Sequence, residues 1–364
     1  MTSAQEPLAL WVCPVSNLAG VARHILDVAR VGLPGWRLAV AAPEGPLLEE
    51  LRALGITVVP LEIGSPSHAA AELRGVLKHL RPAIAHSHLA KADILLAGAS
   101  IGLPLTLVTT EHHISPDRHM FHPSRVGAWS METVHRMRLT RFAAAIAVSA
   151  STSRDMIQRW RPRVPVSVVL NGVDRPVSPP RREPGLRLLS LSRLEREKNV
   201  QMSLQAFARL LPEHPEASFT VAGTGSLSDE LQALARSLGI AKQTRFVGFV
   251  DAEQAMAQHD VLLQPSRSDN FSYALLDALS QGMGVAASPI GGNPEILPKR
   301  CIAPFDDVGR LAEIAVMQGL DVGERPSLSS SIPTVAEMAD GITSVYAGTE
   351  WQNRRGARTG GERT

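Results

Sequence analysis

Several features that would point to particular protein classes are scarce in this chain of 364 residues. Its two cysteines, Cys13 and Cys301, lie far apart and form no metal-spaced pair, so neither a disulfide framework nor a cysteine-based zinc site is expected. Aromatic residues make up 4% and the net charge is +2, which disfavours a nucleic-acid-binding surface. The apolar runs are too short to span a membrane, and the segment from Met1 to Pro7 lacks the basic start of a secretory signal. We therefore expect a cytoplasmic protein that binds no nucleic acid.

The hydrophobic content of 44% and the length are sufficient for two α/β domains, each with its own core. Short apolar runs alternate with amphipathic segments, which predicts parallel sheets covered by helices on both faces. Polar binding groups should then gather at the carboxyl ends of the strands. The predicted strands are Leu8–Val12, Arg37–Ala41, Thr57–Val59, Ala83–His86, Leu105–Thr109 and Ala145–Val148 in the first half, and Leu186–Leu191, Ser218–Ala222, Arg245–Phe249 and Asp260–Leu263 in the second.

A proline-rich segment separates the two halves. Residues 175–185 contain Pro176, Pro179, Pro180 and Pro184, a composition that forms neither a long helix nor an internal strand. We predict a first domain over 1–174, a linker over 175–185 and a second domain over 186–332. A helix over 333–348 is expected to cross back to the first domain, followed by a disordered tail over 349–364 that is rich in Arg and Gly.

The most informative stretch runs from Gln264 to Gly282, where a predicted strand ends in a polar turn and a helical pattern begins. The backbone N–H groups of Asn270, Phe271 and Ser272 would have no intrahelical acceptor, so an anion would fit at that helix start. Two acids, Asp269 and Asp277, flank the same place. The alternative is that Asp269 is an ordinary helix-start residue and Asp277 a solvated charge.

A second charged turn follows the first strand of the second half. It places Arg193 and Lys198 five residues apart between a buried strand and an apolar helix. Two cations at a strand end could neutralise a diphosphate, whereas a surface charge run is the simpler alternative.

Histidines concentrate between the fourth predicted strand and the end of the first half. Neighbouring imidazoles such as His86 with His88, and His112 with His113, raise the possibility of zinc. We predict no metal site, because the region has no helical His-x-x-x-His pair and no nearby Cys. The interpretation we favour is a row of polar groups at strand ends that face a cleft. Seven of the twelve histidines lie in this region: His86, His88, His112, His113, His119, His122 and His135.

Taken together, these segments resemble the retaining glycosyltransferases of family 4. The turn at Asp269 is similar to the family's paired-acid motif, with aspartates in place of both glutamates and Asn270 in place of a glycine. The segment from Gly291 to Glu295 is similar to the family's Gly-Gly-x-x-Glu turn. The Asn-Gly-Val-Asp sequence at 171–174 is a frequent hinge signature of that family.

The resemblance implies an α/β fold of GT-B type, with two Rossmann-like domains whose parallel sheets face a cleft. It implies that nucleotide-sugar binds mostly to the second domain and the acceptor mostly to the first. The implied catalytic residues are Asp269 beside the transferred sugar, His112 in the segment Thr110–Glu111–His112, and Arg193 and Lys198 on the diphosphate. The implied donor-binding residues are Gly20, Gly223, Gly248, Asn270, Phe271, Ser272 and Asp277, with Asp277 on the ribose. The implied acceptor or cleft residues are His88, Arg118 and Glu295.

The resemblance implies sugar transfer with retention of the anomeric configuration. The sequence has no Asp-x-Asp motif, which removes the usual metal-diphosphate clamp of the other large glycosyltransferase fold and predicts a reaction without a metal. A nucleoside diphosphate sugar, with UDP favoured, would be a co-substrate, and no cofactor is expected. The acceptor would be a glycan or a lipid-linked intermediate of cell-surface polysaccharide synthesis. The segment from Ser115 to Phe142 is rich in Arg and also contains apolar residues. It could lie on an anionic membrane surface, at the inner face of the cell membrane, or bind a phosphate-bearing acceptor, and a solvated helix face is the alternative.

Three alternatives to a transferase remain open on the sequence alone. A nucleotide-sugar epimerase shares the fold, and a non-catalytic relative would bind the nucleotide-sugar without turning it over. A periplasmic-type sugar-binding protein also has two α/β domains, but would need a signal peptide.

Overall fold

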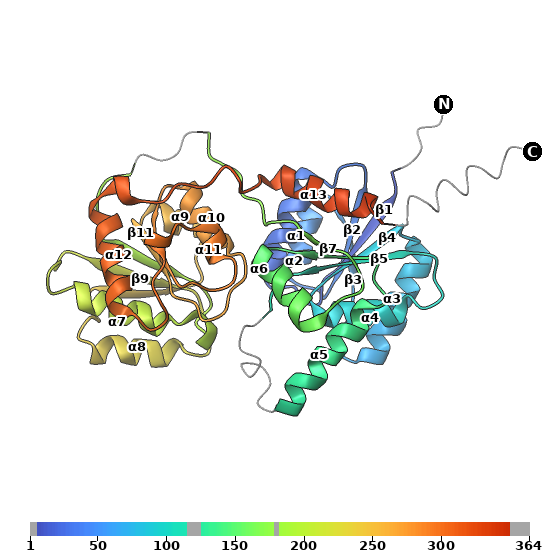
Figure 1. Ribbon diagram of the computed structural model, residues 1–364, viewed down its shortest axis with the longest axis horizontal. Coiled ribbons are helices and arrows are strands. Elements are labelled where there is room, and N and C mark those ends of the chain that lie inside the picture. The colour runs from blue at the N-terminus through green and yellow to red at the C-terminus, as the bar shows by residue number, and fades with distance from the viewer. Residues whose placement is uncertain (1–5, 115–124, 178–181, 350–364) are drawn as a thin grey trace, which may run out of the picture. The chain divides into compact units, whose positions relative to one another are not determined.

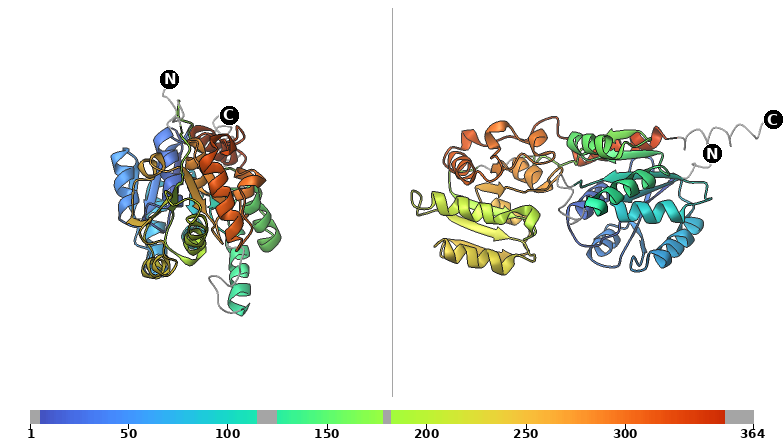
Figure 2. Two further views of the ribbon diagram at one scale, coloured as in Figure 1. Left: turned by 90° about the vertical axis from the view of Figure 1, so that its left-hand side faces the viewer. Right: turned by 60° about the horizontal axis from the view of Figure 1, so that its bottom comes forward.

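The chain forms two α/β units (Figure 1 and Figure 2). The computed structural model describes residues 6–114, 125–177 and 182–349, apart from the side chains of 125–131. The first unit comprises 1–172 together with 333–364, and the second comprises 173–332. Both contain a parallel sheet, which confirms the predicted fold class.

The sheet of the first unit has seven parallel strands over the described residues, in the order β3-β2-β1-β4-β5-β6-β7. Its strands are β1 (Leu8–Val12), β2 (Arg37–Ala42), β3 (Thr57–Pro60), β4 (Ile84–His88), β5 (Thr106–Glu111), β6 (Ala144–Ala147) and β7 (Val166–Val168). Its helices are α1 (Gly20–Val31), α2 (Pro46–Ala53), α3 (Pro66–Leu80), α4 (Ala90–Ala99), α5 (Arg125–Leu139), α6 (Ala150–Asp155) with the π-turn Met156–Trp160, and α13 (Val335–Ala347). In Figure 1, α5 projects beyond the rest of this unit.

The central strand β1 contributes side chains to two hydrophobic cores, one on each face of the sheet. Successive side chains of a strand point to opposite faces of its sheet. Ala9 and Trp11 therefore join the core formed with α1, α2 and α13, whereas Leu10 and Val12 join the core formed with α3 and α4. These four residues are fully buried, which explains why the strand is apolar throughout and does not alternate with polar residues.

The last helix, α13, belongs to the first unit although it follows the second unit in sequence. A Thr334 cap begins the helix, with Glu337 completing a capping box. Tyr346 near its end is fully buried, and its hydroxyl accepts a hydrogen bond from Trp11 Nε1 at 2.8 Å. The same hydroxyl lies 2.6 Å from His86 Nδ1, so α13 is tied to both β1 and β4.

The second unit is built on a five-stranded parallel sheet in the order β10-β9-β8-β11-β12. Its strands are β8 (Arg187–Leu191), β9 (Ser218–Ala222), β10 (Thr244–Gly248), β11 (Val261–Gln264) and β12 (Gly284–Ala287). Its helices are α7 (Val200–Leu210), α8 (Ser228–Ser237), α9 (Ala252–Ala257), α10 (Tyr273–Ser280), α11 (Asn293–Ile296) and α12 (Val308–Leu320), with short 3₁₀ turns at Arg196–Lys198, Lys299–Cys301 and Val322–Glu324. Phe207 of α7 packs on Phe219 of β9 in the core beneath α7, α8 and α12.

The predicted strands are all present, with ends that differ by one or two residues. Two strands were not predicted: β7, which has three residues at the sheet edge, and β12, whose sequence Gly-Val-Ala-Ala is short and poor in large apolar residues. The boundary between the two units falls between Gly172 and Val173, just before the expected linker. The described residues of 175–185 form no helix or strand.

A buried ionic group joins α5 to the sheet of the first unit. The Arg138 side chain is 1% exposed and contacts the carboxylates of Asp93 on α4 and Glu111 on β5. Its NH2 donates to Glu111 Oε2 at 2.6 Å. Asp93 Oδ1 also accepts hydrogen bonds from Ser87 and Thr109, at 2.6 and 2.9 Å. This group therefore connects α5 to α4, β4 and β5 through charged and polar contacts, in addition to the apolar packing of Leu139 at the end of the helix.

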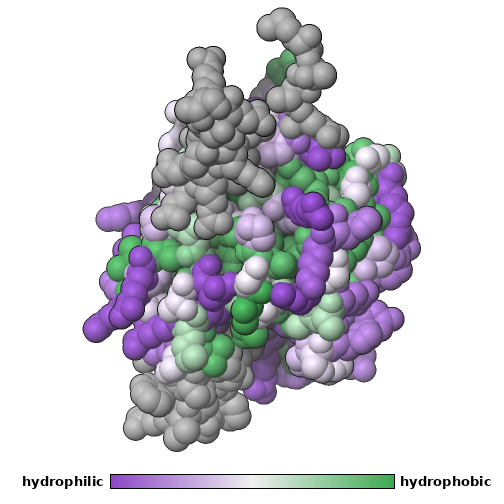
Figure 3. Space-filling view, turned by 90° about the vertical axis from the view of Figure 1, so that its right-hand side faces the viewer, coloured by the Kyte–Doolittle hydropathy of each residue, from purple (hydrophilic) through white to green (hydrophobic). Residues whose placement is uncertain are grey.

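Hydrophobic and hydrophilic residues both occur on the surface of the first unit. Figure 3 shows one of its faces, on which hydrophobic side chains lie among hydrophilic ones. Within the described residues, every helix is too short or too polar to cross a bilayer.

We predict that Arg138→Met lowers the free energy of unfolding by about 3–5 kcal/mol, because it leaves two buried carboxylates without their cation. Urea unfolding measures the change. The matched control is Arg136→Met, on the exposed side of the same helix, which should change stability by less than about 1 kcal/mol. Restoring charge balance with Asp93→Asn and Glu111→Gln in the Arg138→Met background should recover part of the loss. Equal effects of Arg138→Met and Arg136→Met would contradict the anchoring role.

Candidate functional site

In the second unit, the predicted acid Asp269 lies at the centre of a polar cluster beyond the carboxyl ends of β8 and β11. Lys198 Nζ, from the turn after β8, donates to Asp269 Oδ2 at 2.8 Å. Gln264 Nε2, from the last residue of β11, donates to the same oxygen at 2.9 Å. The side chains of Lys198 and Asp269 are 19% and 16% exposed, so the pair is sheltered but still reaches the surface.

The loop that carries Asp269 is fixed from both sides. On the β8 side, the carbonyl oxygen of Glu197 accepts from the backbone N–H of Arg267 at 2.7 Å, and Asn199 Nδ2 donates to the Pro265 carbonyl at 3.1 Å. On the β12 side, the Gly292 N–H donates to the Asn270 carbonyl. The loop is therefore held on both sides by hydrogen bonds that do not depend on a ligand.

Two glycines permit this close approach of loops. Gly291 has φ +52°, and a Cβ there would overlap the carbonyl oxygen of Asp269. Gly223, directly after β9, has φ +131°, and a Cβ there would overlap the carbonyl oxygen of Ser192. Both positions combine a left-handed backbone with contact against another backbone, which only glycine satisfies without rearrangement.

The helix start lies slightly further along the chain than the sequence suggested. Helix α10 begins at Tyr273 with Ser272 as its N-cap, so the amide groups without an intrahelical acceptor begin at Ser272 rather than at Asn270. The N–H of Asn270 donates to Asp269 Oδ1 at 3.0 Å, and the Phe271 side chain is buried. Ser272 Oγ accepts from Gln264 Nε2 at 2.9 Å. Asn270 and Phe271 thus precede the first turn of α10 and belong to the loop that carries Asp269.

Both predicted cations are engaged by carboxylates. Arg193 NH2 contacts Glu197 Oε1 at 2.6 Å, and the Arg193 side chain is 59% exposed. Lys198, in contrast, is sheltered and paired with Asp269. The two cations thus have different surroundings, although the sequence assigned them one role.

The remaining predicted residues of the second unit lie on three further segments. Gly248 ends β10 with φ +68°, and the next residue, Phe249, is 75% exposed. Asp277 is half-buried in the second turn of α10. Glu295 lies in α11 and lines a surface pocket together with Arg300 and Pro326.

The first unit contributes a separate group of polar side chains at the carboxyl ends of its strands. Gly20 begins α1, and a Cβ there would meet no atom within 4 Å. His88 ends β4 and His112 follows β5, and their rings are joined by a hydrogen bond of 2.9 Å between His88 Nδ1 and His112 Nε2. Arg118 lies outside the described residues.

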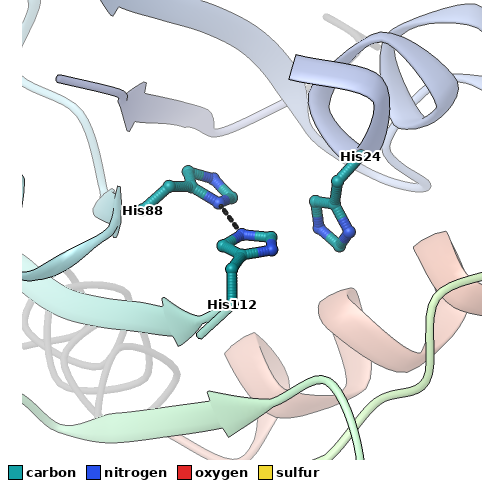
Figure 4. A group of neighbouring side chains, drawn as sticks. All are labelled: His24, His88 and His112. Atoms are coloured by element: carbon teal, nitrogen blue, oxygen red, sulfur yellow. Dashed lines mark hydrogen bonds between the residues drawn. The ribbon is translucent and has the colours of Figure 1, made fainter. Parts of the chain in front are cut away.

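Figure 4 shows that His24 of α1 completes this group, which the sequence analysis did not anticipate. The sequence feature that could have pointed to His24 is its position on the apolar face of α1, next to Ile25 and Val28. Burial lowers the pKa of His24 to about 4, although its hydrogen bond to Asn171 opposes the shift. Burial also holds the pKa of His88 and His112 well below the usual histidine range, so these rings are neutral near pH 7.

Two models of known protein families match adjoining parts of the chain. Residues 18–175 match the model described as Glycosyltransferase Family 4, and residues 176–301 match the model described as Glycosyl transferases group 1. The chain belongs to the family 4 glycosyltransferases.

Curated relatives agree with this membership. The glycogen synthase of Mycobacterium tuberculosis is 30% identical over 60% of this chain and 55% of its own length. A human protein that is named as part of phosphatidylinositol N-acetylglucosaminyltransferase is 25% identical over 79% of this chain and 58% of its own length. The chain thus spans little more than half the length of these two curated relatives.

Among solved structures, the Anabaena protein HepE in complex with UDP-glucose has a TM-score of 0.79 at 18% identity, covering 94% of this chain and all of HepE. Sucrose-phosphate synthase of Thermosynechococcus elongatus has a TM-score of 0.76 at 14% identity, covering 94% of this chain and 98% of that protein. These likenesses show the GT-B fold, which this family 4 member shares.

Proposed function

We propose that this chain is a retaining, metal-independent glycosyltransferase that moves a sugar from a nucleoside diphosphate sugar, preferably a UDP-sugar, to an acceptor. The observation that carries the proposal is the sheltered Asp269–Lys198 pair beyond the carboxyl ends of β8 and β11. It lies in the part of the chain that matches the group 1 glycosyltransferase model. A fixed carboxylate next to a cation suits a reaction in which positive charge develops on a sugar and negative charge on its leaving group.

Lys198 and the first turn of α10 would stabilise the departing diphosphate. Cleavage of the bond from the anomeric carbon to the phosphate oxygen increases negative charge on the β-phosphate. An ammonium group and the partial positive charge of a helix start both favour that charge. Because Lys198 already contacts Asp269, an arriving diphosphate would share the cation, leaving the carboxylate freer to act on the sugar.

Asp269 would lie beside the transferred sugar. The bond from the anomeric carbon to the acceptor oxygen would form on the face from which the diphosphate leaves, and a departing phosphate oxygen would accept the acceptor's proton. No protein nucleophile is then required. The Asp269 carboxylate favours the oxocarbenium-like transition state over the neutral ground state.

His112 would bind the sugar through a hydrogen bond. Its ring is neutral because burial lowers its pKa, and a neutral imidazole can donate to or accept from a hydroxyl. A neutral ring also avoids placing a positive charge beside a developing oxocarbenium.

The known relatives support the donor and suggest the kind of acceptor. HepE was solved in complex with UDP-glucose, which supports a UDP-sugar donor for this chain. The human relative is named for transfer to phosphatidylinositol, so we extend the proposal to a lipid-linked or glycan acceptor of cell-surface polysaccharide synthesis, met at the inner face of the cell membrane. Arg118 and Glu295 remain proposed acceptor contacts.

The direct test is an assay over a panel of UDP- and GDP-sugars, with and without glycan and lipid-linked acceptors. Transfer that depends on an acceptor and retains the anomeric configuration is the expected result. Conversion of the nucleotide-sugar without any acceptor would favour an epimerase. Binding without turnover across the panel would favour a non-catalytic relative.

We predict that Lys198→Met weakens UDP binding by at least about tenfold, since a charge-assisted contact is worth about 1.5–3 kcal/mol. Lys198→Arg should retain part of the affinity because it keeps the charge. Calorimetry measures both, and Lys242→Met, at an exposed position of the same unit, is the control that should leave binding unchanged. Unaltered UDP affinity in Lys198→Met would move the phosphate site elsewhere.

The two acids should differ in kinetics. Asp269→Asn should lower kcat by about 10²–10³-fold with little change in donor KM, because its charge acts at the transition state. Asp277→Asn should raise donor KM about tenfold and leave kcat nearly unchanged, as expected for a ribose contact that is alike in ground and transition states. Asp229→Asn on the exposed start of α8 is the control. Full activity of the Asp269→Asn, Asp277→Asn double variant would refute both roles.

A further inference from the structure

Three histidines of the first unit converge from different elements. His24 lies on α1, His88 ends β4 and His112 follows β5. One ring nitrogen from each lies within 4.8 Å of the others, and Figure 4 shows the three rings near one another. His24 and His88 are 1% and 0% exposed, whereas His112 is only partly buried.

The protonation pattern of His24 is set by its neighbour. His24 Nδ1 lies 3.2 Å from Asn171 Oδ1, which can only accept, so Nδ1 carries the proton and Nε2 presents a lone pair. That Nε2 is buried and, among the described residues, has no hydrogen-bond partner. A ring N–H held by an amide or carboxylate oxygen, with the other nitrogen free, is the usual arrangement of a metal-binding histidine.

His86 provides an internal contrast. It lies directly beside His88, with ring centroids 4.7 Å apart, yet both of its nitrogens are engaged. Nδ1 contacts the Tyr346 hydroxyl and Nε2 contacts Thr110 Oγ1, at 2.6 and 2.7 Å. His86 therefore has a structural hydrogen-bonding role, whereas His24 keeps a buried Nε2 that no described residue satisfies.

The spacing is close to what a tetrahedral ion needs. With bonds of about 2.0–2.1 Å, ligand nitrogens lie about 3.3 Å apart, so the rings need move only by small rotations. The ion would take the position of the proton between His88 Nδ1 and His112 Nε2, and that proton would pass to the outer nitrogen of one of the rings. Three imidazoles suit Zn²⁺ and its first-row neighbours rather than Mg²⁺ or Ca²⁺.

We propose that His24, His88 and His112 form a binding site for a divalent first-row transition metal ion of the Zn²⁺ class, with Asn171 orienting His24. This reverses the sequence-based prediction of no metal site, which compared only histidines close in sequence. The partly exposed His112 gives the ion a route in and leaves a fourth position for water. Because the proposed function assigns His112 to the sugar, bound metal would inhibit transfer, and only this inhibition rests on the proposed function.

The test uses the full chain without an affinity tag, dialysed against chelator and titrated with Co²⁺ alone. The expected result is one equivalent bound per chain, with the visible d–d bands of four-coordinate Co²⁺ and displacement by Zn²⁺. His112→Gln and His24→Gln should each weaken Co²⁺ binding by more than about tenfold, and Asn171→Ala by about tenfold. His113→Ala, next to His112 but outside the group, is the matched control.

X-ray absorption of the Zn²⁺-loaded wild-type chain gives a measurement that does not depend on how well a variant folds. Three imidazole ligands are expected, and fewer would overturn the proposal. Absence of Co²⁺ binding, or equal affinity in His112→Gln and His113→Ala, would also overturn it. These readouts need no transferase activity, so they remain decisive if the proposed reaction fails. If metal binds but transfer is not inhibited, the site stands and the assignment of His112 to the sugar fails.

Discussion

The ion pair of Lys198 and Asp269 connects two loops that parallel strands place at the same edge of the sheet in the second unit. The hydrogen bonds from Arg267 N–H and Asn199 Nδ2 fix the backbone of the loop, and the ion pair fixes the direction of the carboxylate itself. Gln264 adds a neutral donor to the same oxygen. The carboxylate is therefore oriented before any ligand arrives, which reduces the reorganisation needed during a reaction.

In the first unit, the polar groups at the strand ends are mostly neutral. Its strand ends present histidines, whose burial keeps them uncharged, and the charged residues beside them are gathered around Arg138. Asp93 and Glu111 satisfy that guanidinium within the interior, next to the strand end that carries His112. The charges of Arg138, Asp93 and Glu111 contact one another. Neutral rings such as His88 and His112 and this buried ionic group therefore lie at the same end of the sheet.

Much of the fold could be predicted from the sequence, since strands such as Leu8–Val12 are apolar runs bounded by polar turns. Strand β12 could not, because Gly284 to Ala287 have small side chains and owe their pairing to neighbours rather than to propensity. In the site, the loop position of Asp269 followed from the motif, but its partners did not. Sequence spacing does not reveal that Lys198 and Asp269, 71 positions apart, meet, or that Arg193 pairs with Glu197 instead.

The grouping of His24 with His88 and His112 shows the same limit. His24 lies more than sixty positions before His88 and on a helix, so spacing in the sequence gives no sign that the two residues are neighbours. Only the packing of α1 over β1 and β4 brings it there, since Trp11 of β1 lies against His24, His86 and His88.

The burial of Tyr346 in the first unit has a consequence for how the chain is made. Strands β1 to β7 emerge from the ribosome long before α13 is synthesised. The Tyr346 side chain, which contacts Trp11 and His86, is therefore absent while the whole second unit is synthesised. The second unit is continuous in sequence and can complete its core during synthesis. The core that α13 shares with α1 and α2 is therefore completed only after the second unit has emerged, whereas the core beneath α3 and α4 needs no residue of α13.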